Sequence, residues 1–232
     1  MSTSDIAGNI ESVRERIEKA CSRVGRDPGE VTLMAVTKTK TREEAEAAYD
    51  AGIRVFGENR VFEAEEKYAG FHSEAELHLV GHLQSNKAKQ AADLFSWVQS
   101  IDKFKTVGAL EKRLEESDRK MNILFEVNTS GESSKFGYPS VNELLKDMDK
   151  ILRLKHIRPR GLMTIAPFTD DETEIRKSFR SLAKIFLTCK ERFPLEDFDV
   201  LSMGMSQDFE IAIEEGATMV RLGSVIFGAR PA

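Results

Sequence analysis

Two lysines stand directly after an apolar run near the start of the chain, in Thr37-Lys38-Thr39-Lys40. A partly desolvated lysine amine has a lowered pKa and can attack an aldehyde to form a Schiff base. Lys38 lies closer to the apolar run, but residues 38 and 40 share one side of an extended strand, so strand alternation does not choose between them. A solvated position at a loop edge is the structural alternative for either lysine.

Two short segments near the end of the sequence combine glycine with serine: Gly204-Met205-Ser206 and Gly223-Ser224. Glycine lets the backbone approach an oxyanion closely, and serine adds a hydroxyl donor. A glycine followed by a serine cap also ends many strands that bind nothing. The two segments together favour a phosphate site more than either does alone.

Arg221 is the last polar residue before Gly223 in an otherwise apolar segment. A buried guanidinium without an acceptor is costly, so the sequence predicts a partner for it. That partner is either a carboxylate or a ring nitrogen or phosphate of a ligand. Further polar residues follow two earlier apolar segments: Asn59, His82, Gln84 and Asn86. An ordinary helix-capping role is the alternative for each of them.

The apolar pattern predicts eight strands that alternate with helices and would bring these residues to one edge. The strands are expected over residues 31–36, 53–56, 77–80, 97–101, 123–127, 160–165, 198–202 and 218–222. An amphipathic helix over residues 6–24 precedes the first strand. The fold class is therefore α/β, as a (β/α)8 TIM barrel in a single domain, 1–232, with an extra N-terminal helix. An open doubly wound sheet is the alternative.

Composition excludes several classes of function. The chain has 34 Lys+Arg against 39 Asp+Glu, a formal net charge of −5, so no nucleic-acid partner is expected. Cys21 and Cys189 lie far apart, which indicates no disulfide framework and fits a cytoplasmic location. The four histidines lack metal-ligand spacing, so no metal is expected. The sequence contains no GxSxG, P-loop or GxGxxG motif.

No apolar run approaches the roughly 18 residues of a membrane helix, and the first residues do not resemble a signal peptide. We therefore expect no membrane partner. An acidic surface without an evident exposed apolar seam favours a monomer. The longest loop, over residues 128–139, follows the fifth strand and is either functional at the barrel mouth or a solvated connection.

Six segments occur together in the order of one family. They are Ala35-Val36-Thr37-Lys38-Thr39-Lys40, Phe56-Gly57-Glu58-Asn59, Gly81-His82-Leu83-Gln84-Ser85-Asn86-Lys87, Gly161-Leu162-Met163, Leu201-Ser202-Met203-Gly204-Met205-Ser206 and Val220-Arg221-Leu222-Gly223-Ser224-Val225-Ile226-Phe227-Gly228. Over essentially the whole chain the sequence resembles the pyridoxal phosphate homeostasis proteins, the YggS/PROSC family. Arg60 and Phe62 depart from the Tyr and Gln expected there, and Ser224 stands where Thr is common but keeps the hydroxyl.

The resemblance implies a barrel similar to the N-terminal domain of bacterial alanine racemase, with pyridoxal 5′-phosphate (PLP) as cofactor. It implies that Lys38 is the Schiff-base lysine. The other cofactor-binding residues that it implies are Asn59 near the ring, Met163 and Met205 beside the cofactor, Arg221 at the pyridine nitrogen, and Ser206, Gly223 and Ser224 on the phosphate.

The resemblance also implies a role in vitamin B6 homeostasis without robust catalysis, so no catalytic residue is expected. An arginine at the pyridine nitrogen weakens the electron sink that PLP enzymes use. The sequence ends at Ala232, so we expect no counterpart of the alanine racemase domain that supplies a second base, a tyrosine. PLP-dependent acceptor enzymes are expected partners. The alternatives are a slow amino-acid racemase and a Schiff-base aldolase for a phosphorylated aldehyde.

Overall fold

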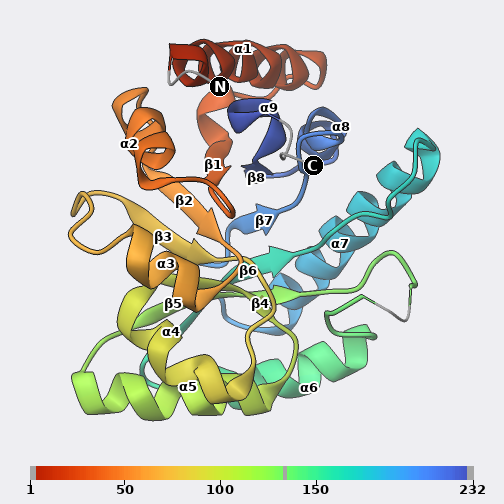
Figure 1. Cartoon of the computed structure of the whole chain (residues 1–232). Helices are drawn as coiled ribbons and strands as arrows, with labels where there is room; N and C mark the ends of the chain where they lie inside the picture. Colours follow the sequence, from red (N-terminus) through yellow and green to blue (C-terminus); the bar gives the residue numbers. More distant parts are fainter. Residues whose placement is uncertain (1–3, 133–134, 229–232) are drawn as a thin grey trace.

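The computed structural model describes residues 4–132 and 135–228, and it shows a closed barrel of parallel strands in sequential order (Figure 1). The predicted (β/α)8 barrel is confirmed. Of the expected domain, 1–232, residues 1–3, 133–134 and 229–232 lie outside the described residues. The strands are β1 (Thr32–Val36), β2 (Val55–Glu58), β3 (Glu76–Leu79), β4 (Trp97–Ile101), β5 (Met121–Glu126), β6 (Ile157–Met163), β7 (Val200–Ser202) and β8 (Met219–Leu222).

Helices follow the strands and cover the outside of the barrel (Figure 1). They are α1 (Ser4–Arg23), α2 (Arg42–Asp50), α3 (Val61–Lys67), α4 (Ala88–Leu94), α5 (Phe104–Ser117), α6 (Val141–Ile151), α7 (Glu172–Arg192), α8 (Phe209–Glu214) and α9 (Ser224–Phe227), with short 3₁₀ turns η1 (Pro28–Glu30) and η2 (Ser85–Lys87). The start of α2 shows why these boundaries follow from sequence. The Thr41 hydroxyl accepts from the Glu44 N–H while the Glu44 carboxylate accepts from the Thr41 N–H.

Most strands begin and end within two residues of the predicted bounds, and two elements differ more. Strand β6 begins at Ile157 instead of residue 160, although Pro159 lies inside it. The strand accommodates Pro159 because the pairing with β5 shifts register between Ile123 and Leu124. The second difference is α9, a single turn after β8 that the sequence analysis did not predict.

The N-terminal helix α1 closes the outside of the barrel. It contacts α2, α8 and α9, and it buries Ile10, Val13 and Ile17 in the main core. In Figure 1 it lies across the seam where β8 meets β1. The four-residue α9 is too short to cover this seam, so α1 occupies the place that an eighth barrel helix would take.

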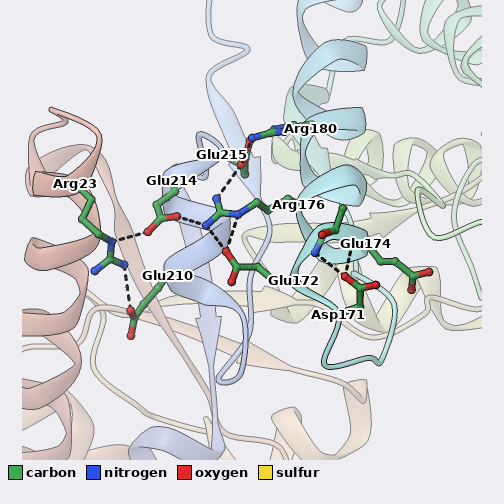
Figure 2. Close-up of polar contacts among 10 residues, drawn as sticks. Arg23, Asp171, Glu172, Glu174, Arg176, Arg180, Glu210, Glu214 and Glu215 are labelled. Carbon is green, nitrogen blue, oxygen red and sulfur yellow. Dashed lines mark hydrogen bonds and ion pairs between the residues drawn. The ribbon is translucent and has the colours of Figure 1, made fainter.

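An ion-pair chain links α1 to α8 and α7 (Figure 2). Arg23 Nε lies 2.6 Å from Glu214 on α8, and Arg176 on α7 contacts Glu214 at 2.5 Å and Glu215 at 3.0 Å. The arginines remain partly exposed, and exposed pairs contribute at most about 1 kcal/mol each. The chain therefore fixes the arrangement of the three helices more than it stabilises them.

Inward-facing side chains fill the barrel. One apolar group consists of Met34, Val36 and Met219, and a second consists of Trp97, Leu124 and Met163.

Both cysteines are buried thiols. Over residues 4–132 and 135–228, no helix combines the length and apolar character needed to cross a membrane. In the same part of the chain, no group of three or more His, Cys, Asp or Glu side chains is placed to hold a metal ion.

A side-chain substitution on the buried face of α1 tests its role as the eighth barrel helix. Ile10 is 1% exposed, so Ile10→Ala should lower the free energy of unfolding by about 2–5 kcal/mol. Urea unfolding measures the effect, with exposed Glu11→Ala on the same helix as control. Equal stability of the two variants would show that α1 is a dispensable addition.

Candidate functional site

The chain turns sharply after β1, at Lys38. The Thr37 N–H donates to the Gly57 carbonyl at 3.0 Å and so extends the β1–β2 ladder by one residue. The Lys40 N–H then closes a turn onto the Thr37 carbonyl at 3.0 Å, and Thr39 has a left-handed φ of 63°. Lys38 is half-buried in this turn. A non-glycine residue in the left-handed region is strained, so the surrounding contacts must hold the turn.

Lys40 has a structural role. Its Nζ donates to the carbonyl of Phe227 on α9 at 3.1 Å and lies 3.4 Å from Glu44 Oε1. It thereby joins the start of α2 to the end of the chain's last helix. The turn at residues 38–39 ends the strand alternation that made the two lysines equivalent in sequence. The assignment of Lys38 as the Schiff-base lysine stays a prediction.

A buried cluster behind β1 supports the turn. Lys67 Nζ lies 2.7 Å from Glu58 Oε1 and donates to the Thr37 carbonyl at 2.5 Å. The Thr37 hydroxyl donates to the same Glu58 oxygen at 2.7 Å and lies 2.6 Å from the Tyr68 hydroxyl. Burial raises the pKa of Tyr68 well above its usual value. The sequence analysis missed this cluster, although Glu58 belongs to one of the quoted segments.

The loops after β7 and β8 meet, as predicted. Ser206 Oγ accepts from the N–H groups of Gly223 at 3.4 Å and Val225 at 3.3 Å. A Cβ on Gly223 would lie 3.3 Å from the Val36 carbonyl oxygen, so glycine allows a close approach to the end of β1. Ser224 is exposed beside them. The two Gly-Ser segments therefore lie next to the strand that leads to Lys38.

Arg221 is 5% exposed, and its partners are uncharged. Nη1 donates to the Ser202 hydroxyl at 2.8 Å, and Nη2 donates to the Thr164 carbonyl at 2.8 Å. Burial lowers its pKa to about 10, while the carboxylates of Asp208 and Glu126 oppose this effect from a longer range. The sequence analysis expected a carboxylate or a ligand as the partner; within the protein no carboxylate contacts Arg221 directly among the described residues, and its partners are Ser202 on β7 and Thr164 just after β6.

Three other predicted residues surround the mouth at different depths. Asn59 is half-buried after β2, and a Cβ on Gly81 would lie only 2.2 Å from its carbonyl oxygen, so the backbone there is tightly held. Met205 is 39% exposed on the rim. Met163 is 1% exposed and packs inside the barrel against Trp97 and Leu124. The two methionines therefore do not share one surface.

The loop over residues 128–139 folds back onto the end of β5; of this loop, residues 133–134 lie outside the described residues. The Tyr138 N–H donates to the Glu126 carbonyl at 2.7 Å. A cavity of about 200 Å³ opens between this loop and β6, and its walls come from Glu126, Val127, Asn128, Lys135, Phe136 and Ile165. Phe136 stacks on His82 with ring centroids 3.9 Å apart. The loop thus belongs to the mouth, and sequence reasoning missed Glu126 and Lys135.

The sequence matches one family over almost its whole length. The model of the alanine racemase N-terminal domain family matches residues 8–231. A protein of Haemophilus influenzae named pyridoxal phosphate homeostasis protein is 39% identical over 229 residues, which cover 97% of this chain and 96% of the relative. The chain belongs to the pyridoxal phosphate homeostasis protein family.

Solved structures agree with this family assignment. PipY of Synechococcus elongatus, solved with PLP bound, is 32% identical with a TM-score of 0.85, and the match covers 96% of this chain and all of PipY. An alanine racemase of Clostridium difficile has a TM-score of 0.78 at 12% identity, over 99% of this chain and 58% of the racemase. This second likeness shows the shared barrel fold alone.

The buried pair behind the turn predicts a large stability loss when one partner is removed. Lys67→Met leaves the Glu58 carboxylate buried without its counter-charge, and the free energy of unfolding should fall by about 3–5 kcal/mol. Denaturant unfolding measures this, and Glu58→Gln/Lys67→Met should recover part of the loss. Arg153→Met, which breaks an exposed pair with Asp149, serves as control and should change stability by less than about 1 kcal/mol. Similar effects of the two single variants would contradict the assignment.

Glu126 predicts a pH dependence of stability. Burial raises its pKa to about 7, against the lowering effect of Arg221 and with a contribution from Asp102. The folded protein binds this proton more tightly than the unfolded chain, where a glutamate pKa is about 4.3. Its contribution is therefore complete below about pH 4.3 and is lost as the pH rises to about 7. The unfolding free energy of the wild type relative to Glu126→Gln should fall by up to about 3 kcal/mol between pH 5 and 8. Parallel pH curves would contradict this.

Proposed function

We propose that this protein binds PLP as a Schiff base on Lys38 and acts in vitamin B6 homeostasis without robust catalysis. The observation that carries the proposal is the closure of the barrel by β1 and β8. It brings the turn at Lys38 next to the Gly-Ser loops after β7 and β8. The family membership and the PLP bound to PipY support the same ligand.

The side chains around the mouth fit this cofactor. Ser206 Oγ accepts two backbone N–H groups, so its own hydroxyl hydrogen remains available to a phosphate oxygen. Gly223 supplies the close backbone approach, and Ser224 adds an exposed hydroxyl. This donor set, with an amine from Lys38, matches a phosphorylated aldehyde.

Arg221 is proposed to face the pyridine nitrogen. Because a guanidinium can only donate, it would bind an unprotonated ring nitrogen. Asn59 is proposed to lie near the ring, with Met205 on the rim and Met163 beneath, inside the barrel. Bound PLP supplies an aldehyde for amine exchange and a ring that withdraws electrons, and Arg221 would weaken that withdrawal.

The tyrosines support a binding role over racemisation. Racemisation requires an acid or base on each face of the substrate α-carbon. The hydroxyl of Tyr138 donates to Asp147, that of Tyr49 donates to Glu74, and that of Tyr68 is buried with Thr37. All three tyrosines of the chain are thus engaged in other contacts.

Cytoplasmic action, a monomeric state and delivery of PLP to acceptor enzymes are part of the proposal. The sequence analysis expected a monomer because no exposed apolar seam was evident, but apolar side chains are exposed around the barrel mouth. Among the described residues, large exposed apolar side chains follow strands β2, β5, β6 and β7: Phe62, Phe136, Ile165, Phe168 and Met205. Light scattering with and without PLP measures the oligomeric state directly.

The anchor is tested by absorbance and mass mapping. Lys38→Ala should lose the PLP-dependent visible band and the adduct fixed by borohydride, whereas Lys40→Ala should keep both because Lys40 contacts Phe227 and Glu44. A retained band in Lys38→Ala would overturn the proposal. A borohydride adduct with a phosphosugar aldehyde, but none with PLP, would indicate the aldolase alternative.

A further inference from the structure

A chain of buried polar side chains crosses the barrel interior and ends at Arg221. Arg221 Nη1 lies 2.8 Å from Ser202 Oγ, Ser202 Oγ lies 2.7 Å from Gln99 Oε1, and Gln99 Nε2 lies 2.9 Å from His78 Nδ1. These residues stand on β8, β7, β4 and β3, and none is more than 5% exposed. The chain interrupts an interior that is otherwise largely apolar.

The hydrogen bonds along this line of side chains run in one direction. Arg221 can only donate, so Ser202 Oγ accepts from it and directs its own hydrogen to the carbonyl oxygen of Gln99. The amide nitrogen of Gln99 then donates to His78 Nδ1, in the tautomer that carries its hydrogen on Nε2, with Met219 Sδ as a further acceptor at 3.1 Å. In this amide orientation Gln99 satisfies both neighbours.

The far end of the chain is consistent with this direction. His78 must be neutral to accept at Nδ1, and burial lowers its pKa. Its hydrogen on Nε2 then faces Glu76 Oε2 at 3.4 Å, an oxygen that also accepts from the Trp97 indole at 2.9 Å. The chain therefore runs from the mouth to the opposite end of the barrel, where Glu76 is 55% exposed.

The hydrogen bonds to Arg221 fix its guanidinium without neutralising the charge. Ser202 holds Nη1, the Thr164 carbonyl holds Nη2, and both acceptors are uncharged. The carboxylates that act on Arg221, those of Glu126 and Asp208, do so from a longer range. A direct carboxylate partner would instead neutralise the positive charge and compete with a ligand for its N–H groups.

We propose that Gln99 is a positioning residue for Arg221. By orienting the Ser202 hydroxyl, it holds the guanidinium in one orientation toward a ring-nitrogen acceptor at the barrel mouth. The inference rests on the proposed function in taking PLP as that ligand and Arg221 as the partner of its ring nitrogen.

The first test measures PLP affinity by fluorescence and the pH profile of the visible band in Gln99→Leu and Gln99→Glu. Gln99→Leu should bind PLP about tenfold more weakly, as expected when a hydrogen bond to a charged group is loosened. Gln99→Glu should shift the pH profile of the band, because it places a negative charge close to Arg221, with only the Ser202 hydroxyl between the two side chains. Leu124→Val, another interior substitution, should change neither readout.

A double variant separates positioning from general damage to the core. Gln99→Leu and Ser202→Ala should combine less than additively in PLP affinity, since both act through the same hydroxyl. Additive losses, or Gln99 variants with the affinity and pH profile of the wild type, would overturn the proposal.

A readout without cofactor keeps this inference distinct from the proposed function. In the apo wild type, NMR should resolve the Nη resonances of Arg221, because two hydrogen bonds restrict rotation of the guanidinium. Gln99→Leu should average them while Leu124→Val should not. Failure of the wild type to bind PLP would refute the proposed function alone, whereas resolved Nη resonances in Gln99→Leu would refute the positioning role alone.

Discussion

The pairing of β1 with β8 is the constraint on which the site depends. These strands lie at opposite ends of the sequence, and their register sets Met34 opposite Arg221. Closure of the barrel places the turn at Lys38 beside the loop at Gly223. The seam is exposed to solvent unless a helix covers it, and α1 provides that cover. The first helix of the chain thus protects the junction that assembles the site.

A second constraint is the cost of placing polar groups in a barrel interior. Burying a positive charge costs free energy unless hydrogen-bond acceptors or an opposite charge surround it. Around Arg221 the solution uses neutral acceptors and a directed hydrogen-bond chain. Behind Lys38 the solution is different, because Glu58 and Lys67 neutralise each other inside the sheet–helix layer. The charge of Arg221, which we propose to bind a ligand, is therefore kept apart from the ion pair that holds the fold.

The mouth combines close backbone approaches with a cavity. Gly223 after β8 lies close to the end of β1, and Gly81 after β3 lies close to Asn59 after β2, so neither position leaves room for a side chain. On the β5 and β6 side, a loop and a cavity contain Glu126 and Lys135. A ligand anchored beside Gly223, as we propose, would have its opposite edge facing this cavity.

The sequence by itself determined the alternation of strands and helices, because this depends on local apolar periodicity. From residue chemistry it also predicted the Gly-Ser loops and Arg221 as binding groups. Strand parity alone does not choose between Lys38 and Lys40, and Lys38 was singled out by its position beside the apolar run and by the family resemblance. Only the tertiary structure shows how the surroundings of the two lysines differ: Thr39 between them has a left-handed φ, and Lys40 contacts Phe227. Partners such as Ser202 and Gln99 come from distant strands, so their hydrogen bonds exist only once the barrel closes.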